Sequence, residues 1–161
     1  MEKIDVEFLG RSPDLKPAIA AILRRSDADF FPPLSARLDL DAYAEKLANA
    51  PDAFFIGAWN QPKSELICLY AGYAREGFEY SFSPYMWVAP EYRSFFLGLR
   101  LHSAAVRHLK SLGMRGIRAK TWVENNDALL AFYKNLGYKI SEPKFDVRLN
   151  RREVDLELTF K

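Results

Sequence analysis

The strongest constraint on the fold is a long amphipathic helix, which the apolar periodicity predicts for about residues 97–112. Gly113 then supplies a residue suited to ending it. The apolar face comprises Leu97, Leu101, Ala104, Ala105 and Leu112, and the polar face comprises Arg100, Ser103, Arg107 and Lys110. Such a helix must bury its apolar face against another layer, and β-rich segments precede and follow it. The chain is therefore expected to be α/β.

Shorter periodic segments complete the predicted order of elements. We expect strands near residues 4–8, 53–59, 65–74, 80–88, 117–123, 138–141 and 153–160, and helices near 14–25, 41–50 and 127–136. Pro32 and Pro33 interrupt the stretch between the first two helices, which reads as a loop. With 161 residues this order predicts a single domain, in which helices pack on the faces of a mixed α/β sheet. Several fold families share this order of elements.

Composition excludes several classes of function. The chain has 49% hydrophobic residues and a formal net charge of +2, which is too small an imbalance to favour nucleic acid or an anionic membrane as partner. Cys68, the single cysteine, lies in the apolar run ELICLYAG and is expected in the core. His102 and His108 are six positions apart, so we expect no metal site. No apolar stretch suits a membrane helix or secretory signal, and we expect a cytoplasmic protein.

The segment VAPEYRSFFLG ends one predicted strand and enters the long helix. The first turn of a helix carries free N–H groups, so this junction is a potential anion site, and Arg93 adds a positive charge suited to a pyrophosphate. A plain strand-to-helix connection with a solvated arginine explains these residues equally well. The physics of the segment alone leaves both interpretations open.

Two motifs together resemble the acetyl-CoA-binding core of the GNAT superfamily. These are V-A-P-E-Y-R with Gly98 five positions after Arg93, and, after a helix and a strand, N-D-A-L-L-A-F-Y-K-N-L-G-Y. The resemblance implies a GNAT-like α/β fold, in which a mixed, mostly antiparallel central sheet carries helices on both faces. It implies acetyl-CoA as the acyl donor. It also implies one acyltransferase domain over residues 1–161, with an acceptor-side wall at about 14–50 and a cofactor-binding core at about 80–140.

The resemblance assigns the cofactor contacts residue by residue. Trp87 and Val88 would meet the pantetheine arm, and the phosphates would lie along the following loop: Arg93, Ser94, Phe95, Phe96, Leu97, Gly98 and Leu99. The family loop usually reads R-G-x-G-x-G or Q-x-x-G-x-G, whereas this chain has R-S-F-F-L-G. Phe96 therefore stands where glycine normally lets the backbone approach phosphate. We expect its side chain to point into the core; the alternative is that it blocks the site.

The resemblance also supplies catalytic candidates. Tyr133 has the family spacing from Asn126 and Gly137, which implies a general acid that protonates the departing thiolate. Asn126 would cap its helix and touch the cofactor arm. The alternative interpretation is that Asn126 is an ordinary N-cap and Tyr133 a packed aromatic residue without a catalytic role. Glu79 and Glu124 are candidate bases. The alternative interpretation of each is a solvated surface glutamate.

The acceptor is expected to meet the loop at residues 26–41, where Asp29, Phe30 and Phe31 are the substrate candidates. The run F-P-P-L-S-x-R-x-D-L-x-x-Y resembles a segment of GNAT-like proteins of bacterial surface-polysaccharide pathways, which would imply an amino-sugar. Other small amines and peptides stay open as acceptors.

Three readings of the function follow from these residues. The first is an N-acetyltransferase that works by direct attack of a primary amine. The second is a degenerate GNAT-fold binding module without transferase activity, which the lost loop glycines favour. The third is transfer of a longer acyl chain, which the sequence does not separate from the first. The aromatic-rich carboxyl half could supply a homodimer surface.

Overall fold

The structure, a computed structural model, describes residues 3–10, 13–60, 62 and 64–161. Its strands are β1 (Glu7–Gly10), β2 (Ala53–Trp59), β3 (Leu66–Tyr73), β4 (Tyr80–Val88), β5 (Gly116–Trp122), β6 (Lys139–Ile140), β7 (Lys144–Asp146) and β8 (Arg151–Thr159). Its α-helices are α1 (Lys16–Ser26), α2 (Leu40–Asn49), α3 (Leu97–Ser111) and α4 (Asp127–Asn135). Four 3-10 turns are η1 (Pro13–Leu15), η2 (Asp27–Asp29), η3 (Leu34–Ala36) and η4 (Pro90–Phe95).

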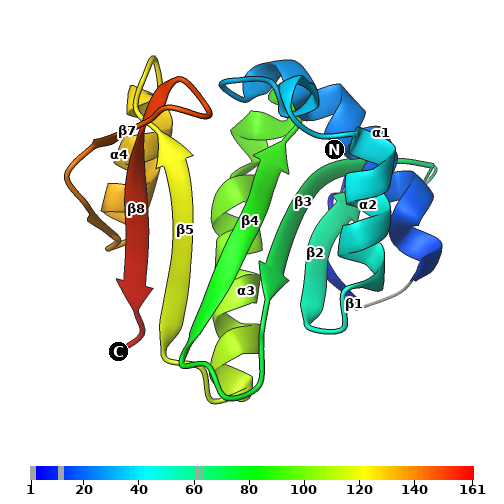
Figure 1. Ribbon diagram of the computed structural model, residues 1–161. Coiled ribbons are helices and arrows are strands. Elements are labelled where there is room, and N and C mark those ends of the chain that lie inside the picture. Colours follow the sequence, from blue (N-terminus) through cyan, green and yellow to red (C-terminus); the bar gives the residue numbers. More distant parts are fainter. Residues whose placement is uncertain (1–2, 11–12, 61, 63) are drawn as a thin grey trace.

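All strands belong to one sheet in the order β1-β2-β3-β4-β5-β8-β6, and β7 also pairs with β8. The β4–β5 pair is parallel, and the other pairs are antiparallel. Helices α1 and α2 lie in front of the sheet in Figure 1, and α3 crosses behind it. These features confirm the predicted mixed, mostly antiparallel sheet with helices on both faces.

Alternation along β2 explains why the sheet has two cores. Phe54 and Ile56 point to one face, where they pack with Leu101 and Leu109 of α3. Phe55 points to the other face, among apolar residues of α1 and α2. Because β2 and β3 are buried on both faces, their sequences read as nearly continuous apolar runs, and Cys68 lies in the core as expected.

The ends of the sheet differ from the prediction in two places. The first strand is Glu7–Gly10 instead of residues 4–8, because β2 pairs only with Glu7, Phe8 and Gly10. Ile4 is buried nonetheless, and its carbonyl accepts a hydrogen bond from Arg100 Nη2 at 2.7 Å. The three-residue strand β7 was not predicted; its pattern is too short to stand out.

Strands β4 and β5 meet at one end and separate toward the other (Figure 1). Pairing joins only Tyr80–Phe82 to Gly116–Arg118. The cause lies on the other side of β4: Phe82 pairs with Tyr73 and Tyr85 with Ala71, so β4 has one extra residue at Ser83–Pro84. Such a bulge bends a strand and increases its twist. The carboxyl half of β4 therefore diverges from β5.

A buried histidine joins α3 to the chain after α4. His102 is 5% exposed, and its Nε2 lies 2.8 Å from the Tyr138 hydroxyl. Burial lowers the pKa of His102 from 6.5 to about 4, because the charged imidazolium would lose its hydration. The neutral ring is therefore the form that the fold stabilises.

We predict that stability falls as the pH is lowered from 6.5 through about 4, the window between the unfolded and folded pKa values of His102. In this window the unfolded chain binds a proton that the folded chain excludes, at a cost of about 3 kcal/mol at most. Urea unfolding at several pH values should show a shallower loss for His102→Gln, whose amide oxygen still accepts from Tyr138. Equal slopes for the two proteins would contradict this role.

Candidate functional site

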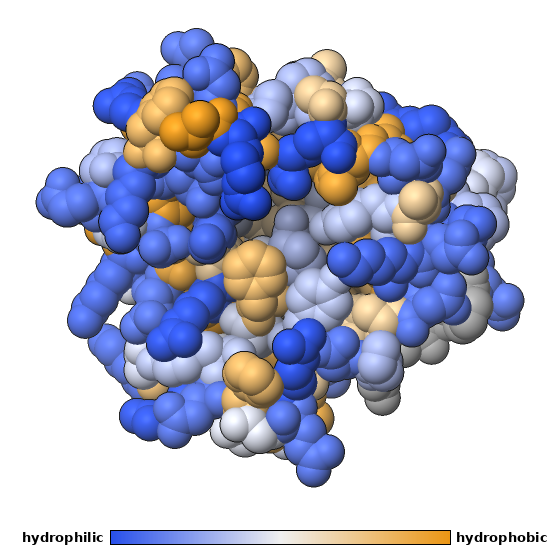
Figure 2. Space-filling view, viewed as in Figure 1, coloured by the Kyte–Doolittle hydropathy of each residue, from blue (hydrophilic) through white to orange (hydrophobic). Residues whose placement is uncertain are grey.

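The separation of β4 and β5 opens a groove of about 650 Å³ between the carboxyl ends of these two central strands. Its walls come from the carboxyl halves of β4 and β5, the loop between α1 and α2, the start of α3, and α4. In the space-filling view, the surface is hollowed above these strand ends (Figure 2). The groove joins the side of the sheet that carries α1 and α2 to the side that carries α3.

The predicted phosphate segment forms one end of this groove. Residues Pro90–Phe95 form the 3-10 turn η4, and α3 begins at Leu97. Arg93 lines the groove; its Nε donates to the Val88 carbonyl at 3.1 Å. The N–H groups of the first turn of α3 have no acceptor within their own helix, so they are available to an anion. Gly98 and Leu99 line the groove beside them.

Phe96 departs from the expectation that its side chain points into the core. The side chain is 74% exposed and lines the groove, and it is Leu97 that is fully buried in the core. The backbone of Phe96 has φ +57° and ψ +28°, the left-handed conformation that glycine adopts without steric cost. The loop thus keeps a glycine-like backbone at a position occupied by phenylalanine.

The other predicted cofactor residues divide into two groups. Trp87, Val88, Asn126 and Tyr133 line the groove. Ser94, Phe95 and Leu97 do not; the first two lie in η4, and Leu97 packs into the core. The side chains of these three residues therefore lie outside the groove.

Tyr133 enters the groove from α4. Its ring packs edge-on against Tyr138, with centroids 5.1 Å apart, and also against Phe132. Burial raises the pKa of Tyr133 to about 12, because the phenolate would be poorly solvated. The hydroxyl is therefore protonated at neutral pH and can donate a proton.

Asn126 occupies the N-cap position of α4 but makes no side-chain cap hydrogen bond, which corrects the predicted capping role. Its Nδ2 instead donates to Trp122 O at 2.7 Å and to Thr121 Oγ1 at 3.1 Å. The amide therefore ties the start of α4 to the end of β5. This contact positions the helix that carries Tyr133.

The structure does not bring the two candidate bases to the groove. Glu79 precedes β4 at the end opposite the groove, about 25 Å along a nine-residue strand, and pairs with Arg115 at 3.3 Å. The carboxylate of Glu124 accepts from Arg152 N and Nε, which lowers its pKa, and it does not line the groove. Both glutamates form ion pairs, with arginine partners that no local sequence pattern indicated.

The acceptor-side candidates lie close to the cofactor side. Asp29 Oδ2 accepts from Trp87 Nε1 at 2.8 Å and from Arg93 Nη2 at 3.3 Å. Phe30 lines the groove between Tyr85 and Trp122, with centroid distances of 5.6 and 5.8 Å. The side chain of Phe31 does not line it; its carbonyl accepts from Arg151 Nη1 at 2.8 Å.

Several groove residues escaped sequence analysis, above all Arg37, Lys120, Trp122 and Arg151. Arg151 lies 120 positions from Phe31, so no local pattern indicated their contact. For Lys120 the available signal was a charge between apolar residues of a strand, which is ordinary for a half-exposed strand.

The match to a family model decides between the possible α/β folds. The model described as the acetyltransferase (GNAT) family matches residues 19–138, more than half of the chain. The chain belongs to the GNAT family. No curated protein matches it.

Solved structures share the GNAT fold at low sequence identity. An aminoglycoside 6'-acetyltransferase type Ii has 20% identity and a TM-score of 0.76, with 96% of each chain covered. The ribosomal-protein-S18-alanine N-acetyltransferase from Escherichia coli has 15% identity and a TM-score of 0.75, with 96% of this chain and 94% of that chain covered. An aminoglycoside 6'-N-acetyltransferase complexed with coenzyme A has 18% identity and a TM-score of 0.72, with 96% of each covered.

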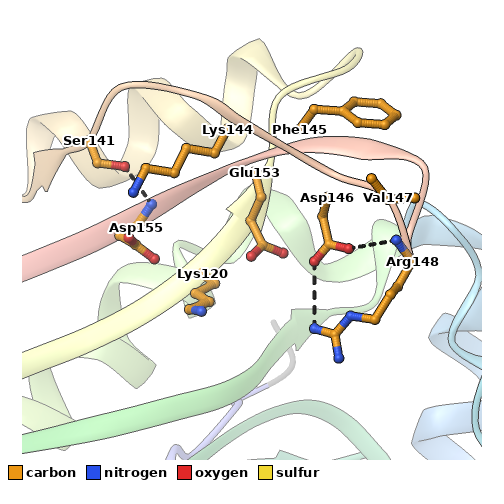
Figure 3. Close-up of a pocket in the computed structure, with 9 residues that line it drawn as sticks. All are labelled: Lys120, Ser141, Lys144, Phe145, Asp146, Val147, Arg148, Glu153 and Asp155. Carbon is orange, nitrogen blue, oxygen red and sulfur yellow. Dashed lines mark hydrogen bonds and ion pairs between the residues drawn. The ribbon is translucent and has the colours of Figure 1, made fainter.

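A second hollow, of about 430 Å³, lies beside the β7–β8 hairpin (Figure 3). Its lining mixes both charges: Lys120, Lys144 and Arg148 face Asp146, Glu153 and Asp155. Within the described part of the chain, no group of three or more His, Cys, Asp or Glu side chains is placed to hold a metal ion. None of the described helices is long and apolar enough to cross a membrane.

We predict that Phe96→Gly raises the free energy of unfolding by about 0.5–1 kcal/mol, because relief of the left-handed strain exceeds the entropy that glycine adds to the unfolded chain. Little packing is lost, since Phe96 is mostly exposed. Urea unfolding measures the change, and Phe95→Gly, in the adjacent 3-10 turn, is the control expected to destabilise. Destabilisation by both variants would contradict strain at Phe96.

Proposed function

We propose that this GNAT-family protein is an N-acetyltransferase that moves an acetyl group from acetyl-CoA to a primary amine of a small molecule or peptide. The observation that carries the proposal is one groove lined by both Arg93 and Tyr133, which lie 40 positions apart in the sequence. The first suits a pyrophosphate, and the second is a protonated phenol.

The described residues fit acetyl-CoA in three respects. The separated strands leave backbone groups of β4 and β5 without strand partners, which suits the amide groups of a pantetheine arm. The first turn of α3 and Arg93 suit the pyrophosphate. The left-handed backbone at Phe96 supplies the loop shape that a glycine would otherwise provide.

Bound acetyl-CoA supplies a thioester whose carbonyl carbon accepts the amine nitrogen as its bond to sulfur breaks. Tyr133 then has the role of general acid, giving its proton to the departing sulfur. A primary ammonium must lose two protons to become an amide nitrogen. One leaves before or during attack, and the second leaves as the C–S bond breaks and restores the proton that Tyr133 has given to the sulfur. Asp29 is the only carboxylate among the described residues that line the groove, and it is already bound by Trp87 and Arg93. We therefore assign the first proton loss to water in the groove, and no covalent enzyme intermediate is required.

The acceptor-side wall at about residues 14–50 would set specificity, with Asp29 and Phe30 toward the substrate. An amino-sugar suits the flat aromatic surfaces of Phe30 and Trp122, which can pack on the apolar face of a sugar ring. Peptide amines are the other class within this proposal, because the neighbours include an enzyme named for acetylating a ribosomal protein.

A second candidate is a GNAT-fold binding module without transferase activity. Phe96 favours it, because its exposed side chain lies in the groove where the family loop has only backbone. The two functions separate in one titration: Phe96→Gly should create or greatly strengthen acetyl-CoA binding if Phe96 blocks the site, and should change it little if the loop backbone already suffices.

We predict that acetyl-CoA binds and that Arg93→Ala weakens its binding about tenfold or more, the value of a lost charge-assisted hydrogen bond. Calorimetry with acetyl-CoA and dephospho-CoA tests this, because both ligands keep the pyrophosphate and should respond alike. Arg107→Ala is the control, an exposed arginine of α3 outside the groove. Failure of the wild-type protein to bind would remove the transferase proposal.

We predict that Tyr133→Phe lowers kcat by about 100-fold to 10,000-fold with little change in acetyl-CoA affinity, since the phenyl ring keeps the packing but loses the acidic proton. Because burial raises the pKa of Tyr133 to about 12, no loss of kcat should arise from its ionisation up to pH 10. Release of the CoA thiol, followed with a thiol reagent, measures kcat of the two proteins and its dependence on pH. Calorimetry measures their affinity for acetyl-CoA. An unchanged kcat in Tyr133→Phe would leave Tyr133 a packing residue.

A further inference from the structure

We propose that the acceptor is a primary amine that also carries an anionic group, a phosphate or a carboxylate, and is not a polycation. The inference rests on the proposed function and goes further by naming the chemistry of the acceptor. It follows from the charges that line the acceptor half of the groove, which lies on the side of the sheet covered by α1 and α2.

The groove is strongly basic although the chain as a whole is nearly neutral. Among the described groove residues that carry a charge at neutral pH, four are basic and one is acidic: Arg37, Arg93, Lys120, Arg151 and Asp29. Arg93 belongs with the start of α3, on the cofactor side. The other three cations line the acceptor half. Low-dielectric walls focus the electrostatic field of such charges within a groove.

The single carboxylate is poorly placed to attract a second or third ammonium. Asp29 Oδ2 already accepts hydrogen bonds from Trp87 Nε1 and Arg93 Nη2. Its negative charge is therefore largely offset by the neighbouring guanidinium. A polycationic acceptor would meet Arg37 and Lys120, which form no ion pair among the described residues, and one compensated carboxylate, which is unfavourable.

Arg37 and Lys120 supply the cations available to a ligand. Both residues are exposed, and within the described ranges neither forms an ion pair. Lys120 follows Ala119, which packs in the α3 core, so Lys120 points to the acceptor face of β5. Asp155 and Glu153 lie beside it on β8 and line the second hollow (Figure 3). These carboxylates partly offset the positive charge of Lys120, whereas the charge of Arg37 has no such neighbour among them.

Arg151 is a partly buried cation at the same wall. Its side chain is 11% exposed; Nη2 pairs with Glu153 at 2.6 Å and Nη1 donates to Phe31 O, while Nε has no partner among the described residues. The guanidinium also lies over the ring of Trp122, 5.8 Å from its centroid. An unsatisfied buried donor is costly, and an anionic ligand or its bound water would satisfy it.

Aromatic residues define the remainder of the acceptor half. Phe30 lies between Tyr85 and Trp122, so the wall offers flat apolar surface next to the cations. The complementary ligand has a ring or similar flat body, an amine directed toward Tyr133, and an anionic group directed toward Arg37 and Lys120. A sugar phosphate that bears an amine and an aromatic amino acid both have this form.

Two matched pairs of acceptors test the inference with acetyl-CoA present. Glucosamine 6-phosphate against glucosamine isolates a phosphate, and phenylalanine against phenylalaninamide isolates a carboxylate; kanamycin supplies the polycation. In one of the two pairs we expect kcat/KM of the anionic member to exceed that of its neutral partner roughly tenfold or more. The pair that shows this preference tells whether the anion is a phosphate or a carboxylate. Binding of the same compounds with CoA present, read from tryptophan fluorescence because Trp87 and Trp122 line the groove, requires no turnover.

The variants Arg37→Gln and Lys120→Gln should each reduce that preference mainly through KM, with acetyl-CoA affinity unchanged. Arg107→Gln and Lys139→Gln are matched controls, because both residues are exposed and lie outside the groove. A preference lost equally in the controls would reflect net charge alone and would contradict a site at the groove.

The outcomes separate this inference from the proposed function. If acetyl-CoA fails to bind, the transferase proposal fails, whatever the amines do. If acetyl-CoA binds but the neutral members or kanamycin match or exceed the anionic members in transfer and in binding, the transferase stands and the anionic acceptor is overturned. Absence of binding by every compound with CoA present would also overturn it.

Discussion

The structure depends on the separation of one pair of neighbouring strands. A parallel pair within an otherwise antiparallel sheet would normally continue its hydrogen bonds along both strands, but β4 and β5 stop pairing after three residues. The extra residue at Ser83–Pro84 bends β4, and Pro84 has no N–H to leave unsatisfied. Backbone groups beyond the bulge must then find partners outside the sheet. A ligand with amide groups can supply these partners. The groove itself exists because the two strands separate.

Everything that borders the groove is positioned by elements packed on opposite faces of the sheet. Tyr133 comes from α4, which Asn126 fastens to the end of β5. The loop between α1 and α2 lies on the opposite face, and Asp29 joins it to the end of β4 through Trp87 and to η4 through Arg93. One carboxylate therefore connects the wall proposed for the acceptor with the loop proposed for the cofactor. Any ligand that competes for Arg93 also changes the surroundings of Asp29.

The sequence predicted the site unevenly, for reasons that lie in the range of each interaction. Arg93 and Tyr133 occur in local motifs, and both line the groove. Glu79 and Glu124 each stand next to a strand end in the sequence. Glu79 precedes the end of β4 that lies away from the groove, whereas Glu124 follows the groove end of β5 but is bound by Arg152, a partner far away in the sequence. The prediction placed the Phe96 side chain in the core because only its backbone would have to face a phosphate, but Leu97 fills that place. Helical phase at the start of α3 decided which of two adjacent apolar residues is buried.

By itself, the sequence determined the α/β class and the order of the elements apart from β7, because periodicity and turn chemistry act over a few residues. Its two local motifs indicated the GNAT family by resemblance, and the family model matches the same part of the chain. Only the tertiary structure decided which charges share the groove. Arg37, Lys120 and Arg151 come from segments 31 to 114 positions apart, and each is an ordinary surface charge in its own segment. Their shared environment depends on the strand order and on the bulge in β4. Long-range packing, which local pattern does not encode, therefore sets the charges of the proposed acceptor site.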